Sequence, residues 1–150
     1  TNEKLSKGIT GIAGEYFAAA ELSRRSFMAS ITLRNNDSID ILASNPRNNK
    51  IYSIQVKTSQ SNNRSWPLSS KSETNFSEHH FYIFINFRGI YERPEYFIVP
   101  SKIVSEAIKL DHQTWLQKPG RNGNIHKDNS LRKFYDIEKT YLEKWDYLEL

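Results

Sequence analysis

The chain contains no cysteine in its 150 residues, which excludes disulfide bonds, thiolate zinc sites and catalysis by a cysteine nucleophile. A glycine-rich phosphate loop and a Ser-His-Asp arrangement are also missing. No apolar run approaches the roughly twenty residues that a membrane-spanning helix needs, and no signal peptide is visible at the N-terminus. We therefore expect a cytoplasmic protein without a membrane partner. Because no repeat or linker interrupts residues 1–150, we expect one domain.

Acidic residues are fewer than basic ones, and the formal net charge of +4 suits a polyanionic partner without requiring one. The cations gather at the end of a predicted helix, in a polar loop and in a late polar segment. The candidate nucleic-acid contacts are Arg24, Arg25, Arg64, Lys71, Arg121, Lys127 and Arg132. For Arg24 and Arg25 the alternative is that they complement the helix dipole, and both interpretations carry equal weight.

Two apolar segments, residues 38–44 and 50–58, are separated by the turn residues 45–49 and predict a β-hairpin. If the turn is centred on residues 47–48, antiparallel pairing places Asp40 opposite Gln55. Lys57 then shares a face with Gln55, because side chains alternate along a strand. A carboxylate placed among apolar strand residues needs a partner, a metal or a substrate. The hairpin is therefore a candidate site.

Upstream, residues 8–25 predict an amphipathic helix whose apolar stripe should face a core. That stripe comprises Ile9, Ile12, Ala13, Tyr16, Phe17 and Ala20. Glu15 lies on its flank, where it can reach the hairpin site, whereas Glu21 is expected to point elsewhere.

Further along, residues 81–87 predict a strand that is apolar on both faces, and residues 96–99 predict another, followed by a helix from Ser101 to about residue 110. Residues 111–133 are expected to hold little regular structure, and residues 136–150 predict a docked amphipathic helix. Within the long loop 59–78, Trp66 is expected to be a core anchor rather than a platform for a stacked base. This element order predicts an α+β fold with a sheet of mixed direction.

The order Glu15, Asp40, Gln55-Val56-Lys57 resembles the core of the PD-(D/E)XK nuclease superfamily, the fold of many type II restriction enzymes. The segments Ile39-Asp40-Ile41-Leu42 and Ile54-Gln55-Val56-Lys57-Thr58-Ser59 are similar to a family of small bacterial proteins within that superfamily, and the likeness spans most of the chain. It implies a restriction-endonuclease-like core, in which helices flank a mixed β-sheet.

The resemblance also implies the chemistry of a metal-dependent DNA endonuclease that hydrolyses phosphodiester bonds. Asp40 would bind Mg²⁺ or Mn²⁺ together with the side-chain oxygen of Gln55, the carbonyl of Val56 and Glu15. Lys57 would position or help to deprotonate the attacking water. DNA is the expected substrate, with RNA as the alternative, and a homodimer is expected because cutting a duplex often recruits a second copy.

Gln55 departs from the superfamily, which usually has an acid there. The loss of a negative charge predicts weaker metal binding and leaves open a non-catalytic nucleic-acid or protein-binding module on a nuclease-like scaffold. The structural alternative is a cross-strand salt bridge between Asp40 and Lys57, with Glu15 as an ordinary carboxylate on the helix surface.

Overall fold

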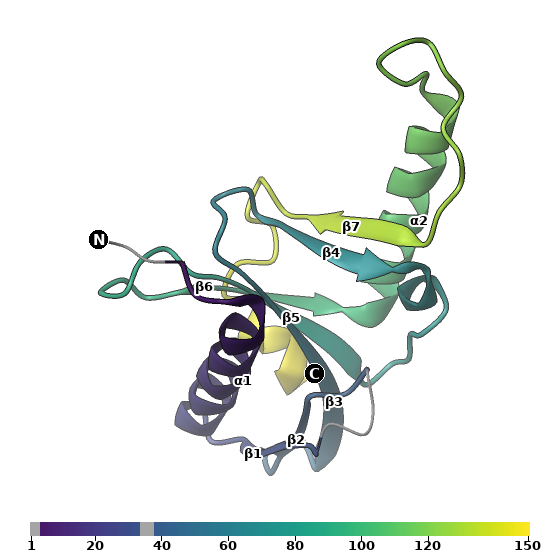
Figure 1. Ribbon diagram of the computed structural model, residues 1–150. Coiled ribbons are helices and arrows are strands. Elements are labelled where there is room, and N and C mark those ends of the chain that lie inside the picture. The colour runs from purple at the N-terminus through teal and green to yellow at the C-terminus, as the bar shows by residue number, and fades with distance from the viewer. Residues whose placement is uncertain (1–3, 34–37) are drawn as a thin grey trace.

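The computed structural model describes residues 4–33 and 38–150. Its elements are, in order, α1 (Lys7–Arg24), β1 (Met28–Ile31), β2 (Ile41–Asn45), β3 (Lys50–Ser59), β4 (Ser65–Ser69), η1 (Ser70–Glu73), β5 (His80–Asn86), β6 (Glu95–Pro100), α2 (Ser101–Gln117), β7 (Leu131–Tyr135) and η2 (Trp145–Glu149). A five-stranded sheet has the order β1-β2-β3-β5-β6, and β4 pairs with β7 in a second, two-stranded sheet (Figure 1). Only β3 and β5 run parallel among these pairs of named strands, so the sheet is mixed as predicted.

The predicted hairpin forms, with Asn45 paired to Lys50 and Ile41 paired to Ile54. The prediction that Asp40 lies inside the first strand is wrong, because β2 begins one residue later. The backbone N–H of Val56 in β3 donates to the Asp40 carboxylate and not to a backbone carbonyl. The side chain of Asp40 therefore replaces one of the hydrogen bonds that would otherwise join two strand backbones.

α1 forms as predicted but turns a different face to the sheet. Its buried residues are Thr10, Gly14, Ala18, Glu21 and Leu22. The expected apolar stripe is instead largely exposed. Glu21, expected to point elsewhere than the hairpin site, is buried and pairs with Arg93. Close approach decides the orientation, since a Cβ added to Gly14 would lie 1.7 Å from the Thr58 Oγ1 atom of β3. Small side chains let the helix come nearer to the sheet than large ones allow.

Side-chain alternation along the sheet separates two cores. The face covered by α1 and η2 contains even-numbered residues of β3, such as Ile54 and Val56. α2 and the β4–β7 pair cover the opposite face, where the core is rich in aromatic residues. Trp66 is fully buried there, and its Nε1 donates to the carbonyl of Ile85 at 3.0 Å, which confirms the core-anchor prediction.

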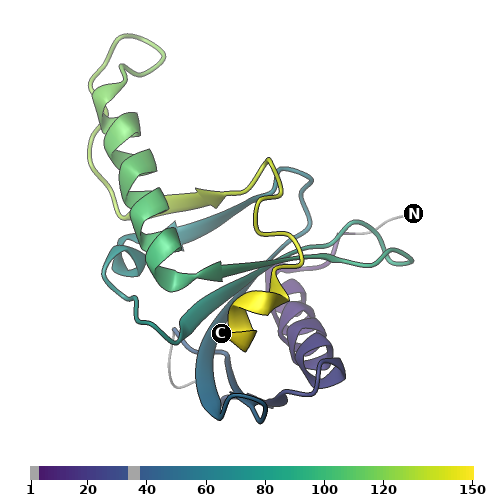
Figure 2. The same cartoon turned by 180° about the vertical axis from the view of Figure 1, so that it is seen from behind.

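α2 is longer than the helix expected to end near residue 110. Its first turns are buried through residues such as Val104 and Ile108. The outer turns and the following loop, residues 118–130, stand away from the sheets and form an arm (Figures 1 and 2). Ser101 is not its N-cap, because Pro100 holds that position and the Ser101 hydroxyl donates to the carbonyl of Ser77.

The C-terminal segment docks on the core but is not the predicted amphipathic helix. The Asp136 carboxylate accepts the backbone N–H groups of Thr140 and Tyr141 at 2.8 Å, which holds this stretch in turns. A short 3₁₀ helix then buries Trp145 and Leu148. Turn-forming hydrogen bonds from a side chain compete here with helical ones.

Candidate functional site

Asp40 lies at the point where β2 and β3 part. Its backbone N–H donates to the carbonyl of Ile54 at 2.8 Å, and its Oδ2 accepts the backbone N–H of Val56 at 2.7 Å. The half-buried Asp40 is thus hydrogen-bonded to the two residues on either side of Gln55. One carboxylate oxygen is therefore held in a fixed place beside Gln55.

Gln55 and Lys57 project from the face of β3 opposite to α1, because the residues between and before them pack against the α1-side core. Gln55 is buried and Lys57 is half-buried. In the parallel ladder they lie beside Tyr82 and Phe84 of β5. The Val56 carbonyl points to the same edge of β3 as its N–H, which is the edge that Asp40 occupies.

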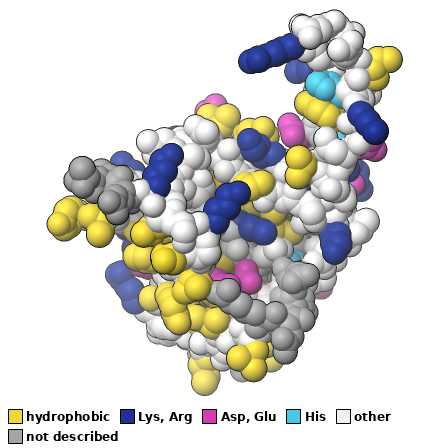
Figure 3. All heavy atoms as spheres, viewed as in Figure 1, with side chains coloured by type: hydrophobic (Ala, Val, Ile, Leu, Met, Phe, Trp, Pro, Cys, Tyr) yellow, Lys and Arg dark blue, Asp and Glu magenta, His cyan; other side chains and the backbone are white. Residues whose placement is uncertain are grey.

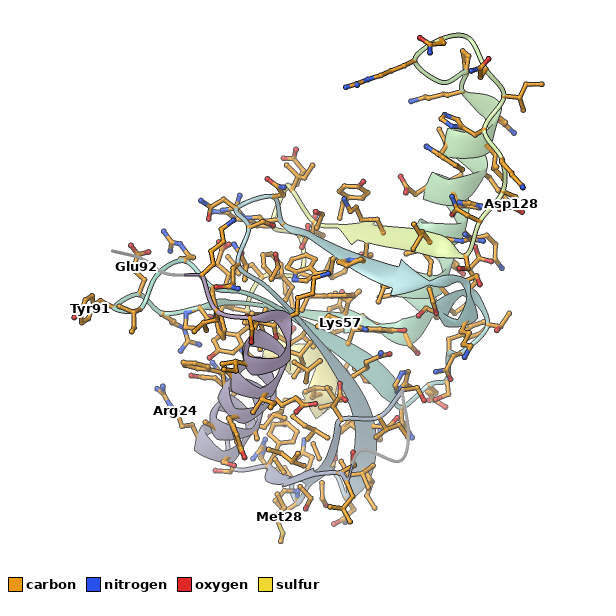
Figure 4. All side chains as sticks on the ribbon, viewed as in Figure 1. Arg24, Met28, Lys57, Tyr91, Glu92 and Asp128 are labelled. Atoms are coloured by element: carbon orange, nitrogen blue, oxygen red, sulfur yellow. The ribbon has the colours of Figure 1, made fainter. Side chains whose placement is uncertain are left out.

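Glu15 approaches this region from α1. Gly14 sits against Thr58, the residue that follows Lys57, so the helix places Glu15 next to this part of β3. Figure 4 shows Lys57 near the middle of the molecule, where β3 passes the N-terminal half of α1. α1 covers the face of β3 opposite to Gln55 and Lys57, so the structure does not bring Glu15 onto the face that carries these two side chains.

The salt-bridge alternative finds no support in the described part of the chain, where Asp40 and Lys57 form no ion pair with each other. The Asp40 carboxylate is instead oriented by a backbone donor. Charge-assisted hydrogen bonds of this kind are short and directional. The structure thus brings Asp40, Gln55 and Val56 together, with Lys57 next along the strand and Glu15 on the adjacent helix.

His80 belongs to the same face of the sheet and was not among the predicted site residues. Its Nδ1 lies 2.8 Å from the hydroxyl of Ser53, and β5 sets it beside Ser53 in the ladder. Burial lowers the pKa of the His80 imidazole, while the Ser53 hydrogen bond and the charge of Asp40 act in the opposite direction. Only the parallel pairing of β3 and β5, which the sequence pattern did not show, brings His80 near Asp40.

Four of the seven candidate nucleic-acid contacts form ion pairs within the protein: the exposed Arg24 and three half-buried arginines. Arg64 contacts both carboxylate oxygens of Glu95 at 3.2 Å. Arg132, with only 7% of its side chain exposed, contacts Glu73 at 2.7 Å. Arg25 pairs with two acids and lies over the ring of Trp145. These guanidinium groups hold parts of the fold together.

Arg24 and the other three candidates are exposed, in different parts of the molecule. Arg24 contacts Glu21 and lies at the end of α1 remote from Lys57 (Figure 4). Lys71 is on η1, while Arg121 and Lys127 are on the arm. Figure 3 shows Lys and Arg side chains spread from the centre of this face out to the arm, interrupted by isolated acidic ones. The exposed cations form a dispersed field rather than one compact patch.

The donors at Asp40 suit a hard divalent cation. They are a carboxylate, an amide oxygen and a backbone carbonyl, which are ligand types that Mg²⁺ and Mn²⁺ accept. Within residues 4–33 and 38–150, no three His, Cys, Asp or Glu side chains cluster closely enough to form a metal site by themselves. A cation at this position would therefore depend on Gln55 and Val56 as well as on carboxylates.

No protein-family model and no curated protein sequence matches the chain. The fold does match that of a bacterial homing endonuclease, I-Ssp6803I, with a TM-score of 0.55 and 11% sequence identity over 97% of this chain and 92% of that one. The two chains share a fold. The predicted α+β architecture, a restriction-endonuclease-like mixed sheet flanked by helices, is thus confirmed.

A Holliday junction resolvase from Archaeoglobus fulgidus, Hjc, also matches, over 83% of this chain and 88% of that one. The identity is 14% and the TM-score is 0.42, which is too low to bear on the fold. Across the described residues, neither helix has the length and apolar character needed to cross a bilayer.

Proposed function

We propose that this protein is a divalent-metal-dependent endonuclease that hydrolyses phosphodiester bonds in DNA. The observation that carries the proposal is the Asp40 carboxylate, held by the Val56 N–H beside Gln55 and Lys57. The likeness in fold to a homing endonuclease supports it, and so does the resemblance of the Asp40, Gln55 and Lys57 pattern to the PD-(D/E)XK superfamily. We assign this chain to that superfamily on these grounds.

Mg²⁺ or Mn²⁺ would be held by Asp40, by the side-chain oxygen of Gln55, by the Val56 carbonyl and by Glu15. With Oδ2 committed to the Val56 N–H, Oδ1 of Asp40 is the oxygen that we assign to the cation. When bound, such a cation lowers the pKa of a coordinated water and offsets negative charge on the phosphate.

Lys57 supplies the positive charge of the protein itself at this place. It projects from the same face of β3 as Gln55, so its ammonium can orient the attacking water and stabilise the charge that develops on the phosphate oxygens. Half-burial limits the competition from bulk water and strengthens this electrostatic effect.

Duplex DNA would run from the Asp40 site across the face shown in Figure 3 toward the arm. Lys71, Arg121 and Lys127 are the exposed cations that we assign to its phosphates. The ion-paired Arg25, Arg64 and Arg132 are assigned to the fold instead, and Arg24 is assigned away from this path. RNA remains the alternative substrate, and the cytoplasmic location stays a prediction.

The test is cleavage of plasmid and branched DNA with Mg²⁺ or Mn²⁺, by the unaltered chain and by Asp40→Asn and Lys57→Met. Each substitution should lower the cleavage rate by about a hundredfold or more, because each removes a group needed in the transition state. Asp111→Asn, which neutralises an exposed acid on α2, is the matched control and should leave the rate unchanged. Matching RNA substrates, assayed in parallel, identify the nucleic acid that is cut.

A metal-binding readout accompanies this assay. Mg²⁺ or Mn²⁺ should raise the melting temperature of the unaltered chain, and Asp40→Asn should abolish the rise. Cleavage that survives Asp40→Asn would contradict the assignment of the site.

The second candidate, a binding module without catalysis, is favoured by one observation. Asp40, just before β2, is the single carboxylate that residues 38–59 contribute to the site, because Gln55 stands where an acid is usual. Under this interpretation DNA is bound in a salt-sensitive manner but is not cut with any divalent metal. Gln55→Glu separates the two candidates. It should strengthen metal binding in both cases, but it should raise an existing cleavage rate only if the chain is a nuclease.

A further inference from the structure

Large apolar side chains on the outer face of α1 stay uncovered after folding. Ile9, Tyr16 and Phe17 are 57%, 64% and 43% exposed, and Ile12 is 37% exposed. The helix already meets the sheet through Gly14 and Ala18, so no rearrangement of this contact buries the stripe. A continuous apolar stripe of this size on a folded protein indicates an interaction surface.

The connection between β5 and β6 adds to the same surface. At its tip Ile90 is 86% and Tyr91 is 99% exposed. The ring of Phe87, at the base of this connection, contacts the ring of Phe17 on α1, with centroids 5.4 Å apart. Figure 3 shows hydrophobic side chains gathered over α1 and beside this tip. We call α1, the tip and the space between them the α1–hairpin surface.

A hollow of about 440 Å³ lies between the two elements, with Phe17, Ala20, Pro94 and Tyr96 in its lining. Ile90 and Tyr91 line the same hollow, so the surface has an apolar protrusion, the Ile90–Tyr91 tip, at the edge of a recess whose lining is partly apolar and partly charged. Four charged side chains also line the recess. Glu21 and Arg93 pair with each other, whereas Arg24 on the helix side and Glu92 on the hairpin side are more than half exposed.

We propose that the α1–hairpin surface is the interface of a two-fold symmetric homodimer, in which the Ile90–Tyr91 tip of each copy enters the recess of the other. A two-fold interface uses one patch twice and so must be complementary to itself. One chain here supplies both the protrusion and the recess. It also supplies a cation and an anion at the rim, so that Arg24 of one copy faces Glu92 of the other.

The area available is adequate for such a dimer. The six exposed apolar residues of the surface present on the order of 700 Å² per copy, close to the ~800 Å² that each partner contributes to a standard interface. Nucleic acid is a poor occupant, because the patch is apolar and its Tyr91 tip lies on the opposite side of the molecule from the arm (Figure 4). This inference does not depend on the proposed nuclease activity.

Sedimentation equilibrium at micromolar concentrations tests the proposal first. The unaltered chain should have twice the chain mass of 17.5 kDa. Tyr91→Asp should weaken the dimer at least thirtyfold, as expected for an aromatic anchor placed in a recess. Ile125→Asp, at a residue that is 91% exposed on the arm, is the matched control and should remain dimeric. Unchanged melting curves should show that both variants fold.

Cross-linking tests whether the tip of one copy lies in the recess of the other. Because the chain has no native cysteine, only the introduced cysteines can form a disulfide. A mixture of Ala20→Cys and Tyr91→Cys chains should form a covalent dimer on mild oxidation. A mixture of Ala20→Cys and Ile125→Cys chains should not. Equal cross-linking in both mixtures would overturn the arrangement.

Two results would overturn the proposal altogether. One is an unaltered chain that stays monomeric throughout the concentration range. The other is a monomer that binds vesicles of phosphatidylcholine and phosphatidylserine and loses this binding with Tyr91→Asp. The α1–hairpin surface would then be a membrane-binding surface and not a dimer interface. Neither result bears on the cleavage assay, so failure of the dimer and failure of the nuclease can be told apart.

Discussion

The two helices pack on opposite faces of the same sheet in different ways. α1 lies flat against the sheet through small residues, down to Gly14, and keeps its large apolar side chains outside. α2 is anchored through buried residues from Ser101 to His112, such as Val104 and Ile108, and its outer turns leave the body (Figures 1 and 2). Both helices thus have a part that the core does not use, but only one of these parts is apolar.

That difference suggests a division of roles. The outer face of α1 carries exposed hydrophobic side chains, which suit another protein surface. The arm carries Arg121 and Lys127, which suit phosphates. Contacts within the arm keep it in place: the Trp115 ring stacks on His126 with centroids 4.0 Å apart, and His112 Nε2 lies 2.7 Å from Asp128 Oδ1.

The largest expected effect is a difference in the free energy of unfolding between substitutions at buried and at exposed positions of α2. Ile108→Ala removes a fully buried side chain and should lower the free energy of unfolding by about 2–5 kcal/mol. Leu110→Ala removes a side chain that is 66% exposed only two residues later, and should change it by less than about 0.5 kcal/mol. Urea denaturation measures both. Equal losses would mean that the arm is part of the core.

Next in size is the close approach of α1 to the sheet. Gly14→Ala should lower the free energy of unfolding by about 1–3 kcal/mol, because its Cβ would collide with Thr58. Gly11→Ala is the matched control, since nothing lies within 4 Å of a Cβ there. It should instead raise the free energy of unfolding by about 0.5–1 kcal/mol, because alanine favours the helix. A neutral Gly14→Ala would contradict the packing described.

The arm should affect DNA binding where the far end of α1 does not. Arg121→Gln and Lys127→Gln should each weaken binding similarly on all sequences and lower the slope of log K against log salt by about one. Arg24→Gln should leave the slope unchanged, since Arg24 lies at the end of α1 away from the proposed path. Fluorescence anisotropy at several salt concentrations provides the measurement. An effect of Arg24 as large as that of Arg121 would remove the distinction.

The smallest effect is a different response to acid on the two faces of the sheet. On the α2 side, the pKa of buried His80 is below its ordinary 6.5, so its contribution to stability is complete above pH 6.5 and falls as the pH drops below that value. On the α1 side, the hydrogen bond from Arg93 lowers the pKa of Glu21, so the contribution of Glu21 is lost only as the pH falls below 4.5.

Urea denaturation at a series of pH values tests this difference. His80→Asn should flatten the stability curve as the pH falls below 6.5, and Glu21→Gln should flatten it below 4.5. If His80→Asn leaves the upper part of the curve unchanged, the imidazole is not buried in its neutral form.

The hairpin and its candidate site could be predicted because their determinants are local. The turn at residues 45–49 and the alternation of β3 determine the register, so the position of Asp40 beside Gln55 followed from a short stretch of sequence. The position of His80 could not be predicted, because parallel pairing joins strands that are distant in the chain. The ion pairs that engage Arg64 and Arg132 with Glu95 and Glu73 are non-local for the same reason.

By itself the sequence predicted α1, the β2–β3 hairpin with its register, and the strands β5 and β6. It did not predict β1, nor β4 and η1 in the expected loop 59–78, nor β7 in the segment expected to hold little regular structure. Only the tertiary structure decided which face of α1 is buried, how far α2 extends beyond the core and which cations are engaged by acids. The physical reason is that periodicity reports only that a face is apolar, whereas burial depends on how closely two surfaces can approach. For α1 that distance is set by Gly14 against Thr58, and it leaves the larger side chains facing outward.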